Sequence, residues 1–349
     1  MPATRKGAAA PTVRTEERRG FERVLGHERV ISLLNSQRLA GRLAHAYCLI
    51  GDEAVGKTTV ALALAEELLL EPGRPHRLEV HPDCWLDDRS DAISIDEIRF
   101  HREKGALAHD TSLQQFLSLK PFMAASRVAI LANAERMTEA AQNCLLKTLE
   151  EPPENTVLVL ATAYPDHLLP TCLSRCQVLS LGPVPRAELA GWLRERHGRD
   201  DADALAAFAQ GRPGLALRAV GDPHWLQRMT AWSAELAPLA FADAGSVLAY
   251  AGRFGQGPAA EQRRLAGEAV RAFALWIRDA LLLRSGREDL VATLPERREA
   301  LADWAGRLPA DHLRSVLAAA QRTQLSLDQN VNPRLAMEIL LLDLRPVKA

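Results

Sequence analysis

The sequence predicts an α/β phosphate-binding domain built on a parallel sheet, followed by a mostly helical second half. Residues 51–58 match the pattern G-x-x-x-x-G-K-[ST] between an apolar run, Tyr47–Ile50, and an Ala-, Leu- and Glu-rich stretch, residues 60–70. Short apolar runs then alternate with helical patterns as far as residue 184. Beyond that point β-branched runs largely stop, and apolar residues recur at i, i+3 and i+4 spacing.

Length and composition narrow the class of protein. A chain of 349 residues is too long for one ordinary core, so two or three domains are expected. With 43 basic and 44 acidic side chains the net charge is −1, so any contact with nucleic acid must come from a local patch or from partner subunits. No run of about 18 apolar residues is present, so no membrane span is expected. The five cysteines form no CxxC pair, which favours a reduced cytoplasm over a disulfide framework.

The N-terminal region precedes the phosphate-binding domain. Residues 1–20 carry basic side chains among Ala, Pro, Thr and Gly, with no apolar stretch of a secretory signal, and predict a disordered basic tail. Residues 21–39 have apolar side chains at helical spacing. A helix is therefore expected ahead of the first strand.

The glycine loop is the candidate nucleotide site. Gly51 and Gly56 let the backbone wrap closely around an anion, and Lys57 neutralises phosphate charge. The Thr58 hydroxyl can reach a magnesium ion, and Thr59 follows it in the first turn of the helix among the expected nucleotide contacts. The alternative is a chance glycine turn before a helix.

Further strands are expected along the first domain. Residues 127–131, 156–161 and 177–181 are apolar runs, and residues 93–99 predict a short strand that enters a helix. Residues 139–151 are a strongly patterned helix that two prolines stop. In such a parallel sheet the ligand lies at the carboxyl ends of the strands.

The second half is expected to contain helices only. Residues 186–218 predict a small helical bundle, and the chain beyond it is nearly all helical pattern. Its helices are expected over residues 225–239, 244–253, 261–284, 296–308, 310–325 and 333–344. Their apolar stripes are assigned to core packing, because most stripes at this spacing are core.

The strand at residues 127–131 ends without the acidic pair of an ATPase. In a P-loop ATPase one carboxylate there holds magnesium, and its neighbour orients or deprotonates the attacking water. Ala132 and Asn133 occupy these places and can do neither. Asp110 and Glu135 are close in sequence, but we expect them on the wrong side of the strand end to substitute. The chain is therefore not expected to turn over ATP by itself.

Two motifs carry a resemblance to a known family. Residues 127–156, and the segment L-L-P-T-C-L-S-R-C-Q at residues 168–177, resemble the bacterial clamp-loader subunits of DNA polymerase III, within the AAA+ superfamily. Residues 330–344 resemble the end of that family's helical collar. The resemblance begins at about residue 21, and it is weakest over residues 71–92 and 223–325.

The resemblance implies a domain organisation and a role. It implies a P-loop AAA+ domain over residues 21–184, a helical lid over residues 185–222 and an oligomerisation collar over residues 223–349. The missing acidic pair points within the family to the delta-prime subunit rather than to the ATP-hydrolysing gamma/tau subunit. Such a cytoplasmic subunit joins gamma/tau and delta subunits in a ring that places the sliding clamp on primer-template DNA. A self-sufficient gamma-type ATPase is the alternative.

The resemblance also implies roles for two residues. Arg175, within Ser174-Arg175-Cys176, matches an arginine finger that acts in trans on the neighbouring subunit's γ-phosphate, where a guanidinium stabilises transition-state charge. The alternative is an exposed surface arginine. Thr162 takes the place of the family's first sensor, or it caps a turn. Glu150, on the helix before the two prolines, is interpreted as solvated or interfacial.

Three departures from the family pattern bear on cofactors. Of a four-cysteine zinc module only Cys84 remains, so neither zinc nor another protein-held metal is expected. The nearby histidines are too irregularly spaced to complete such a site: His76, His81 and His101. Gly214 stands where the lid of active relatives has a sensor arginine. The phosphate loop is intact, which leaves binding of ATP or ADP with Mg²⁺, without hydrolysis, open.

Overall fold

The computed structural model describes residues 19–70, 78–89, 91–100, 111–222, 224–328 and 331–346. The chain forms two compact units, Met1–Val184 and Pro185–Ala349. Each unit has its own hydrophobic core. The predicted division of the second unit into a lid and a collar stays a prediction.

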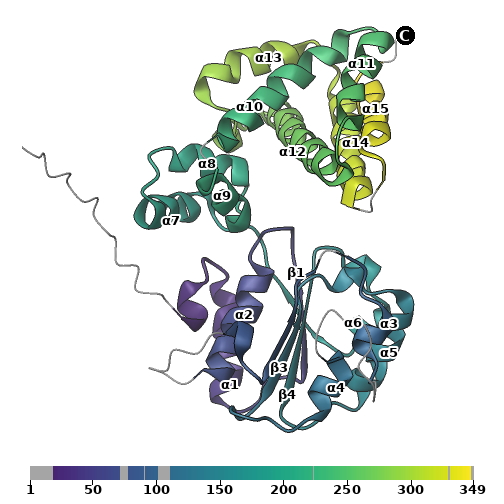
Figure 1. Ribbon diagram of the computed structural model, residues 1–349. Helices are drawn as coiled ribbons and strands as arrows, with labels where there is room; N and C mark the ends of the chain where they lie inside the picture. Colours follow the sequence, from purple (N-terminus) through teal and green to yellow (C-terminus); the bar gives the residue numbers. More distant parts are fainter. Residues whose placement is uncertain are drawn as a thin grey trace, which may run out of the picture. The chain divides into compact units, whose positions relative to one another are not determined.

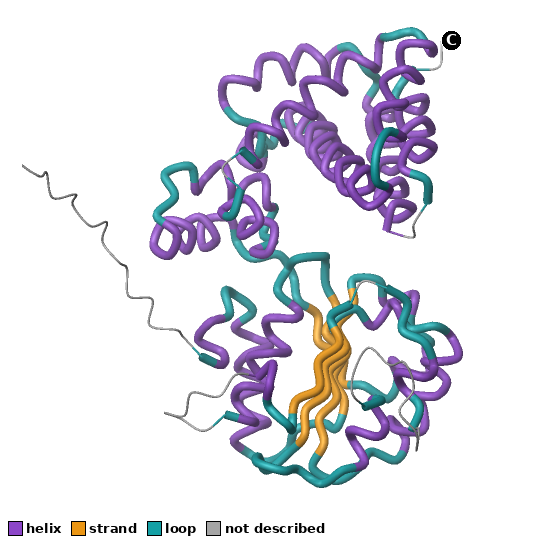
Figure 2. The backbone as a smooth tube through the Cα atoms, viewed as in Figure 1, coloured by secondary structure: helices purple, strands orange, loops and turns teal. Residues whose placement is uncertain are grey.

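The first unit is a five-stranded parallel sheet with helices on both faces (Figures 1 and 2). Its strands are β1 (Ala46–Ile50), β2 (Cys84–Asp87), β3 (Arg127–Leu131), β4 (Thr156–Thr162) and β5 (Gln177–Ser180). Their order across the sheet is β2-β3-β4-β1-β5, so β4 lies between the strand before the glycine loop and the strand that lacks the acidic pair. Because all five strands are parallel, their carboxyl ends lie together at one end of the sheet.

Side chains along each strand point alternately to the two faces of the sheet, and each face packs against its own set of helices. Tyr47, Ile130 and Val159 belong to a core with α1 (Glu28–Leu39) and α2 (Lys57–Leu69). Strand residues one position away point to the opposite face, which is what a period of two produces. That face packs against α3 (Ile95–Ile98), α4 (Leu113–Ser118), α5 (Glu139–Glu150) and α6 (Pro170–Leu173).

Four of the strands agree with the prediction to within one residue. The strand β2 was not predicted; it lies at the sheet edge, where a four-residue run of mixed polarity gives little signal. Of the short strand entering a helix that was predicted over residues 93–99, the helix is confirmed and the strand is wrong. Ile93 makes only an isolated bridge with Met137, and a capping box of Ser94 and Glu97 then starts α3.

Helices are the only regular secondary structure among the described residues of the second unit, as predicted. Its α-helices are α7 (Arg186–His197), α8 (Ala202–Ala209), α9 (Pro213–Val220), α10 (Trp225–Leu236), α11 (Ala244–Ala251), α12 (Ala259–Arg284), α13 (Arg298–Gly306), α14 (Ala310–Asp328) and α15 (Pro333–Asp343). The 3₁₀ turns of the two units are η1 (Gly20–Arg23), η2 (Leu78–Val80), η3 (Ala134–Arg136), η4 (Pro165–His167), η5 (Ala237–Phe241), η6 (Gly252–Gly255), η7 (Glu288–Leu290) and η8 (Pro295–Arg297).

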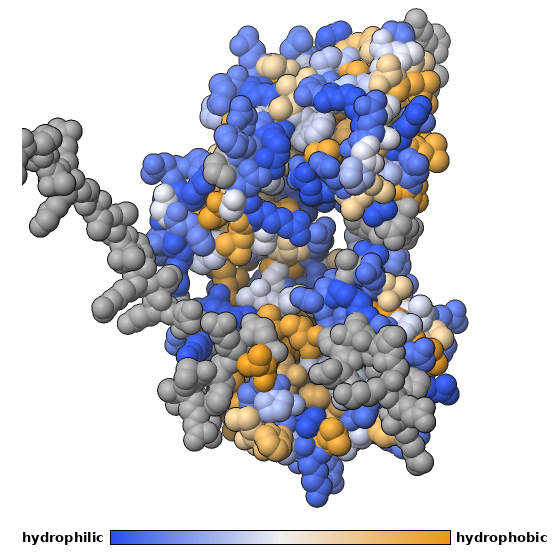
Figure 3. Space-filling model, viewed as in Figure 1, coloured by the Kyte–Doolittle hydropathy of each residue, from blue (hydrophilic) through white to orange (hydrophobic). Residues whose placement is uncertain are grey.

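Polar side chains cover much of the visible face of each unit, with smaller apolar areas between them (Figure 3). Within the described part of the chain, no helix is both long enough and apolar enough to cross a bilayer.

Candidate nucleotide-binding site

The glycine loop runs from the end of β1 into α2 and is held by its neighbours. The Gly51 amide donates to the Thr162 carbonyl at 3.3 Å, and the Leu181 amide donates to the Ile50 carbonyl at 2.7 Å. A Cβ added at Gly51 would lie 2.4 Å from the Leu181 carbonyl oxygen. Only glycine therefore fits the first position of the loop.

The start of α2 is open to an anion. Gly56 precedes the helix with φ of 117°, a conformation that favours glycine, and none of the described side chains caps the helix there. Its first amides are thus available to phosphate oxygens, which the helix dipole also attracts. His27, which the sequence analysis missed, braces the loop from outside, with Nε2 3.0 Å from the Val55 carbonyl oxygen.

Lys57 is folded into the loop. Its Nζ donates to the carbonyl oxygens of Gly51 and Asp52 at 2.7 and 2.8 Å, and the residue is 8% exposed. Burial lowers the pKa of Lys57, while the negative charges of Glu135, Glu53 and Asp52 oppose that effect. The free helix amides, the two glycines and this buried ammonium fit a polyphosphate group.

The threonines lie beside this loop. Thr58 and Thr59 are partly buried in the first turn of α2. Thr162 ends β4, fully buried, and pairs in register with Ile50 at the start of the loop. Its hydroxyl accepts from the Tyr164 amide at 3.0 Å, so it caps the turn after β4. A role for Thr162 as a nucleotide sensor stays a prediction.

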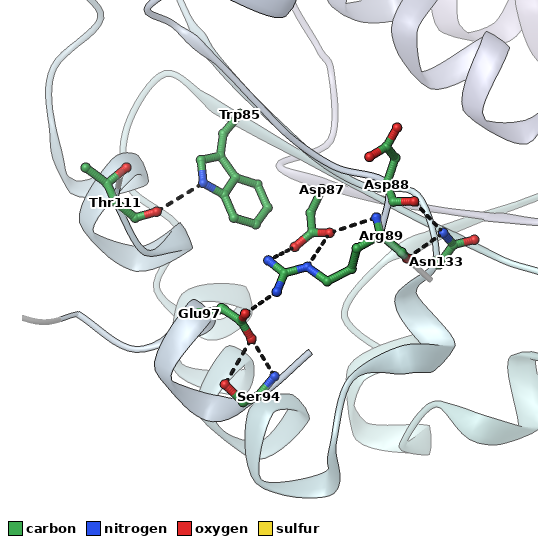
Figure 4. A network of polar contacts seen from close by, with 8 residues as sticks. All are labelled: Trp85, Asp87, Asp88, Arg89, Ser94, Glu97, Thr111 and Asn133. Carbon is green, nitrogen blue, oxygen red and sulfur yellow. Dashed lines mark hydrogen bonds and ion pairs between the residues drawn. The ribbon is translucent and has the colours of Figure 1, made fainter. Parts of the chain in front are cut away.

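The tip of β3 is bound to the end of β2 rather than open to a ligand. The Ala132 amide donates to the Asp87 carbonyl at 2.8 Å. The Asn133 side-chain amide donates to the carbonyl oxygens of Asp88 and Arg89 at 3.1 and 2.9 Å (Figure 4). The two positions offer a methyl group and an amide already engaged, which does not fit a catalytic magnesium ion.

A buried ionic network adjoins that tip (Figure 4). Arg89 donates to Asp87 at 2.9 Å and also contacts Glu97, and Glu97 accepts from the Ser94 amide at 2.7 Å. Burial alone would raise the pKa of Glu97, but Ser94 and Arg89 outweigh it and hold that pKa below its ordinary value. Because three strand spacings, about 14 Å, separate β2 from β1, the Asp87 carboxylate is remote from the glycine loop.

Glu135 corrects the sequence analysis. We expected it on the wrong side of the strand end, yet it has the largest effect of any carboxylate on the pKa of Lys57, and it also raises the pKa of Cys48. Its Oε2 is buried without a hydrogen-bond partner among the described residues. This carboxylate belongs to the turn η3, which packs against β4. Asp110 lies outside the described residues.

Arg175 lies between α6 and β5, in an exposed ion pair. Its guanidinium donates to Glu150 Oε1 at 2.6 Å and to the Thr171 carbonyl at 2.9 Å, and the two charged side chains are 35% and 51% exposed. Gln177 pairs with Tyr47, so Arg175 is level with a point six residues before Gly51. That is about 20 Å along the strands. Arg175 therefore lies at the amino-terminal end of the strands, whereas its own glycine loop lies at their carboxyl-terminal end.

Burial sets the protonation state of two cysteines, and the described side chains form no metal cluster. All five cysteines are free, and burial raises the pKa of Cys48 to about 11 and of Cys176 to about 12. These two thiols stay protonated at neutral pH. No cluster of three metal-ligating side chains exists among the residues that the structure describes. His76 and His101 lie outside those residues, so the expected absence of zinc stays a prediction.

Known proteins resemble the region that carries this site. Residues 26–185 match the family model described as DNA polymerase III, delta subunit. The chain is 30% identical over 209 residues to DNA polymerase III subunit delta' of Escherichia coli K12, which covers 55% of this chain and 59% of that protein. It is 35% identical over 171 residues to subunit delta' of Bacillus subtilis 168, covering 46% and 49%.

A second type of subunit matches as well. The Escherichia coli K12 subunit tau is 32% identical over 203 residues, covering 56% of this chain and 31% of that protein. A DNA polymerase III gamma subunit-related protein of Thermotoga maritima matches in structure with a TM-score of 0.46 and 20% identity, over 89% of this chain and 98% of that one. The chain spans 59% or less of the length of these three curated relatives. Over the matched regions, the chain is therefore similar to the delta-prime and tau subunits of DNA polymerase III.

Proposed function

We propose that this protein is a delta-prime-type clamp-loader subunit, which binds a nucleotide without hydrolysing it and supplies Arg175 to a neighbouring ATPase site. The proposal depends mainly on the two residues that follow β3. Ala132 has no metal-binding atom, and the Asn133 amide is engaged with backbone carbonyls at the end of β2. An ATPase of this class needs carboxylates at these positions.

Nucleotide binding is assigned to the glycine loop. Gly51, Gly56 and the first amides of α2 would surround the phosphates, and Lys57 would exchange its two carbonyl partners for phosphate oxygens. Thr58 and Thr59 would complete the contacts. A magnesium ion on the nucleotide would screen phosphate charge. This chain offers it the Thr58 hydroxyl but no carboxylate at the tip of β3.

Arg175 suits action in trans. Because Arg175 lies at the end of the strands opposite to its own glycine loop, it cannot contact a nucleotide bound in that loop. Its pairing with Glu150 is exposed, and such pairs contribute about 0.2–1 kcal/mol, so a neighbour's phosphate can replace Glu150 at little cost. The arginine then presents a rigid fork of donors to the charge that develops in the transition state.

The partners follow from the same assignment. The subunit would assemble in the cytoplasm with gamma/tau and delta subunits of the DNA polymerase III holoenzyme. Through the assembled ring it would help to open the sliding clamp and to place it on primer-template DNA. The net charge of −1 agrees with DNA contacts that arise mainly from the assembly.

One observation favours a second candidate, a self-sufficient ATPase of the gamma/tau type. The charge of Glu135 acts on Lys57, and one of its carboxylate oxygens is buried with no hydrogen-bond partner in the described part of the chain. If this carboxylate held magnesium or oriented water, the missing pair at Ala132 and Asn133 would be replaced from the next turn of the chain. The assignment as a delta-prime-type subunit treats Glu135 instead as the counter-ion of Lys57.

Reconstitution tests the assignment of Arg175. A ring assembled from clamp-loader subunits with the Arg175→Ala variant should assemble normally and hydrolyse ATP at the adjacent site about 10³-fold more slowly. Arg175→Lys keeps the charge but not the planar fork, so it should restore only part of that rate. An Arg175→Ala ring whose single-turnover rate equals that of the parent would rule out the finger.

A further inference from the structure

A buried glutamine of α5 links that helix to the segment that carries Arg175. Gln142 is 4% exposed and belongs to α5, which packs against α6 on one face of the sheet (Figure 1). Its side-chain amide is bonded to residues outside its own helix. The Oε1 accepts from the Leu169 amide at 2.7 Å, and the Nε2 donates to the carbonyl oxygens of His167 at 3.0 Å and Met137 at 3.2 Å.

These three bonds explain how a polar side chain is buried at this position. A buried amide without partners costs free energy, and here three of the four hydrogen bonds that a glutamine amide can make are present. The backbone of Gln142 adds a further contact, since its carbonyl accepts from the Cys172 thiol at 3.6 Å. Leu169 is the residue that precedes α6, and Cys172 lies within it. Gln142 therefore fixes the start of α6 against α5.

Backbone hydrogen bonds connect that contact to Arg175. The Leu169 carbonyl accepts from the amides of Cys172 at 2.9 Å and Leu173 at 3.2 Å. The Arg175 amide in turn donates to the Cys172 carbonyl at 3.2 Å. The segment from Leu169 to Arg175 is thus one hydrogen-bonded unit, so a displacement of its start also displaces the arginine at its end.

Two residues of α5 hold this segment, one at each end. Gln142 holds the start through buried bonds, and Glu150 holds the end through its ion pair with Arg175, in which the Glu150 side chain is 51% exposed. The two residues are separated along the helix axis by about 12 Å. An exposed ion pair is weak, whereas breaking a buried hydrogen bond leaves polar groups unsatisfied. When Arg175 leaves Glu150, Gln142 still anchors the segment.

We propose that Gln142 is a positioning residue for Arg175, which fixes α6 so that the guanidinium reaches a neighbouring subunit's γ-phosphate in one orientation. This inference rests on the proposed role of Arg175 as a finger. The side chain of Gln142 is buried and bonded within its own subunit, so it acts on the reaction through the arginine alone. Because rate depends steeply on the geometry of the reacting groups, a small shift of Arg175 slows hydrolysis. The affinity for ATP is not affected by such a shift.

A double-mutant cycle on reconstituted clamp-loader rings tests the proposal by single-turnover ATP hydrolysis. Gln142→Met keeps the length of the side chain but removes its amide, so it should slow the adjacent site about 10- to 100-fold at an unchanged Kd for ATP. In an Arg175→Ala ring the same substitution should slow hydrolysis by less than about twofold more, because its effect passes through Arg175. Gln142→Asn keeps the amide on a shorter side chain and should give an intermediate rate.

Gln115→Met is the matched control. Gln115 lies on α4 of the same unit, and its side chain forms no hydrogen bond with any residue that the structure describes, so the rate should equal that of the parent ring. Size-exclusion chromatography of the rings and unfolding midpoints of the isolated chains show whether each variant folds and assembles. Gln142→Asn carries the same cycle if Gln142→Met does not fold.

Two results would overturn the role of Gln142 alone, given a slow Arg175→Ala ring. One is a Gln142→Met ring as fast as the parent. The other is a loss that multiplies in full with that of Arg175→Ala, since this marks a defect independent of the arginine. An Arg175→Ala ring as fast as the parent would instead overturn the finger and the role of Gln142 together.

Discussion

At the scale of single residues, Glu150 forms an ion pair with Arg175, the arginine that we propose as a finger. Arg175 also donates a hydrogen bond to the Thr171 carbonyl. Because both charged side chains of the ion pair are exposed, the pair is weak. The sequence analysis interpreted Glu150 as solvated or interfacial, without a link to Arg175. The link depends on how α5 and α6 pack, which a linear pattern does not show.

Glu150→Gln tests whether that ion pair matters. The amide removes the ionic attraction and leaves Arg175 bonded to the Thr171 carbonyl only, so a reconstituted ring should keep its ATPase rate or gain up to about fivefold, the equivalent of 1 kcal/mol. The measurement is single-turnover hydrolysis beside the same ring with Arg175→Ala. A rate that falls as far with Glu150→Gln as with Arg175→Ala would show that Glu150 itself serves the reaction.

Glu135→Gln separates the two candidate functions. If Glu135 is only the counter-ion of Lys57, removing its charge reduces repulsion of phosphate, and affinity for ATP should rise about fivefold with or without magnesium. If Glu135 holds magnesium, affinity for Mg·ATP should instead fall while that for magnesium-free ATP does not. Isothermal titration of both ligands against the isolated chain distinguishes the two results.

At the scale of elements, the sequence predicted well those that have a strong local signal. The strands β1, β3 and β4 are apolar runs buried on both faces, and α5 has a threonine N-cap at one end and prolines after the other. The analysis missed β2, and it expected a strand before α3 where the structure has only an isolated bridge at Ile93. Residues 93–96 alternate between apolar and polar side chains more regularly than β2 does, yet only β2 pairs with β3.

The direction of Glu135 could not be predicted for a related reason. The residue sits in a 3₁₀ turn that follows Asn133, and the backbone of Asn133 departs from both helical and extended geometry. One residue of such a turn redirects the next side chains by a large angle. Sequence spacing alone therefore could not show that the charge of Glu135 acts on the pKa of Lys57.

The glycine loop offers a test at this scale. Gly51→Ala places a methyl group 2.4 Å from the Leu181 carbonyl, so the loop must shift. We expect unfolding free energy to fall by about 1–3 kcal/mol and nucleotide affinity to fall at least 10-fold. The measurements are thermal unfolding and titration with ADP.

Gly182→Ala is the matched control for this substitution. A Cβ there meets nothing within 4 Å, and the residue has no positive φ, so stability and affinity should stay near the parent values. Equal effects of the two substitutions, or no effect of Gly51→Ala, would contradict the structure of the loop.

At the scale of the whole molecule, Asp83 ties the edge of the sheet to the segment before β3. Its buried carboxylate accepts from the amides of Phe122, Met123 and Ala124 at 2.7–2.9 Å and lies 3.5 Å from Arg127. Burial alone would raise the pKa of Asp83, but these amides and the arginine outweigh it and hold the pKa below its ordinary value.

The lowered pKa of Asp83 makes its contribution to folding stability depend on pH. Because the folded pKa of Asp83 is below the unfolded value of about 3.9, its contribution is complete above that pH and is lost as the pH falls toward the folded pKa. Asp83→Asn should cost about 2–4 kcal/mol at pH 7 and progressively less below pH 4.

Urea unfolding of the parent, of Asp83→Asn and of Asp166→Asn between pH 3 and 7 measures this difference. Asp166 is exposed, so its substitution is the control and should change stability by less than about 0.5 kcal/mol. A difference between parent and Asp83→Asn that grows on acidification would contradict the assigned pKa direction.

The central claim is that the protein keeps a phosphate loop while the carboxylates needed to use it for hydrolysis are missing from β3. Steady-state ATP hydrolysis by the isolated full chain, with Lys57→Ala beside it, tests this most directly. We predict that the parent binds ATP or ADP, that Lys57→Ala does not, and that neither hydrolyses ATP above background with magnesium present. Magnesium-dependent turnover by the parent that disappears in Lys57→Ala would contradict the claim.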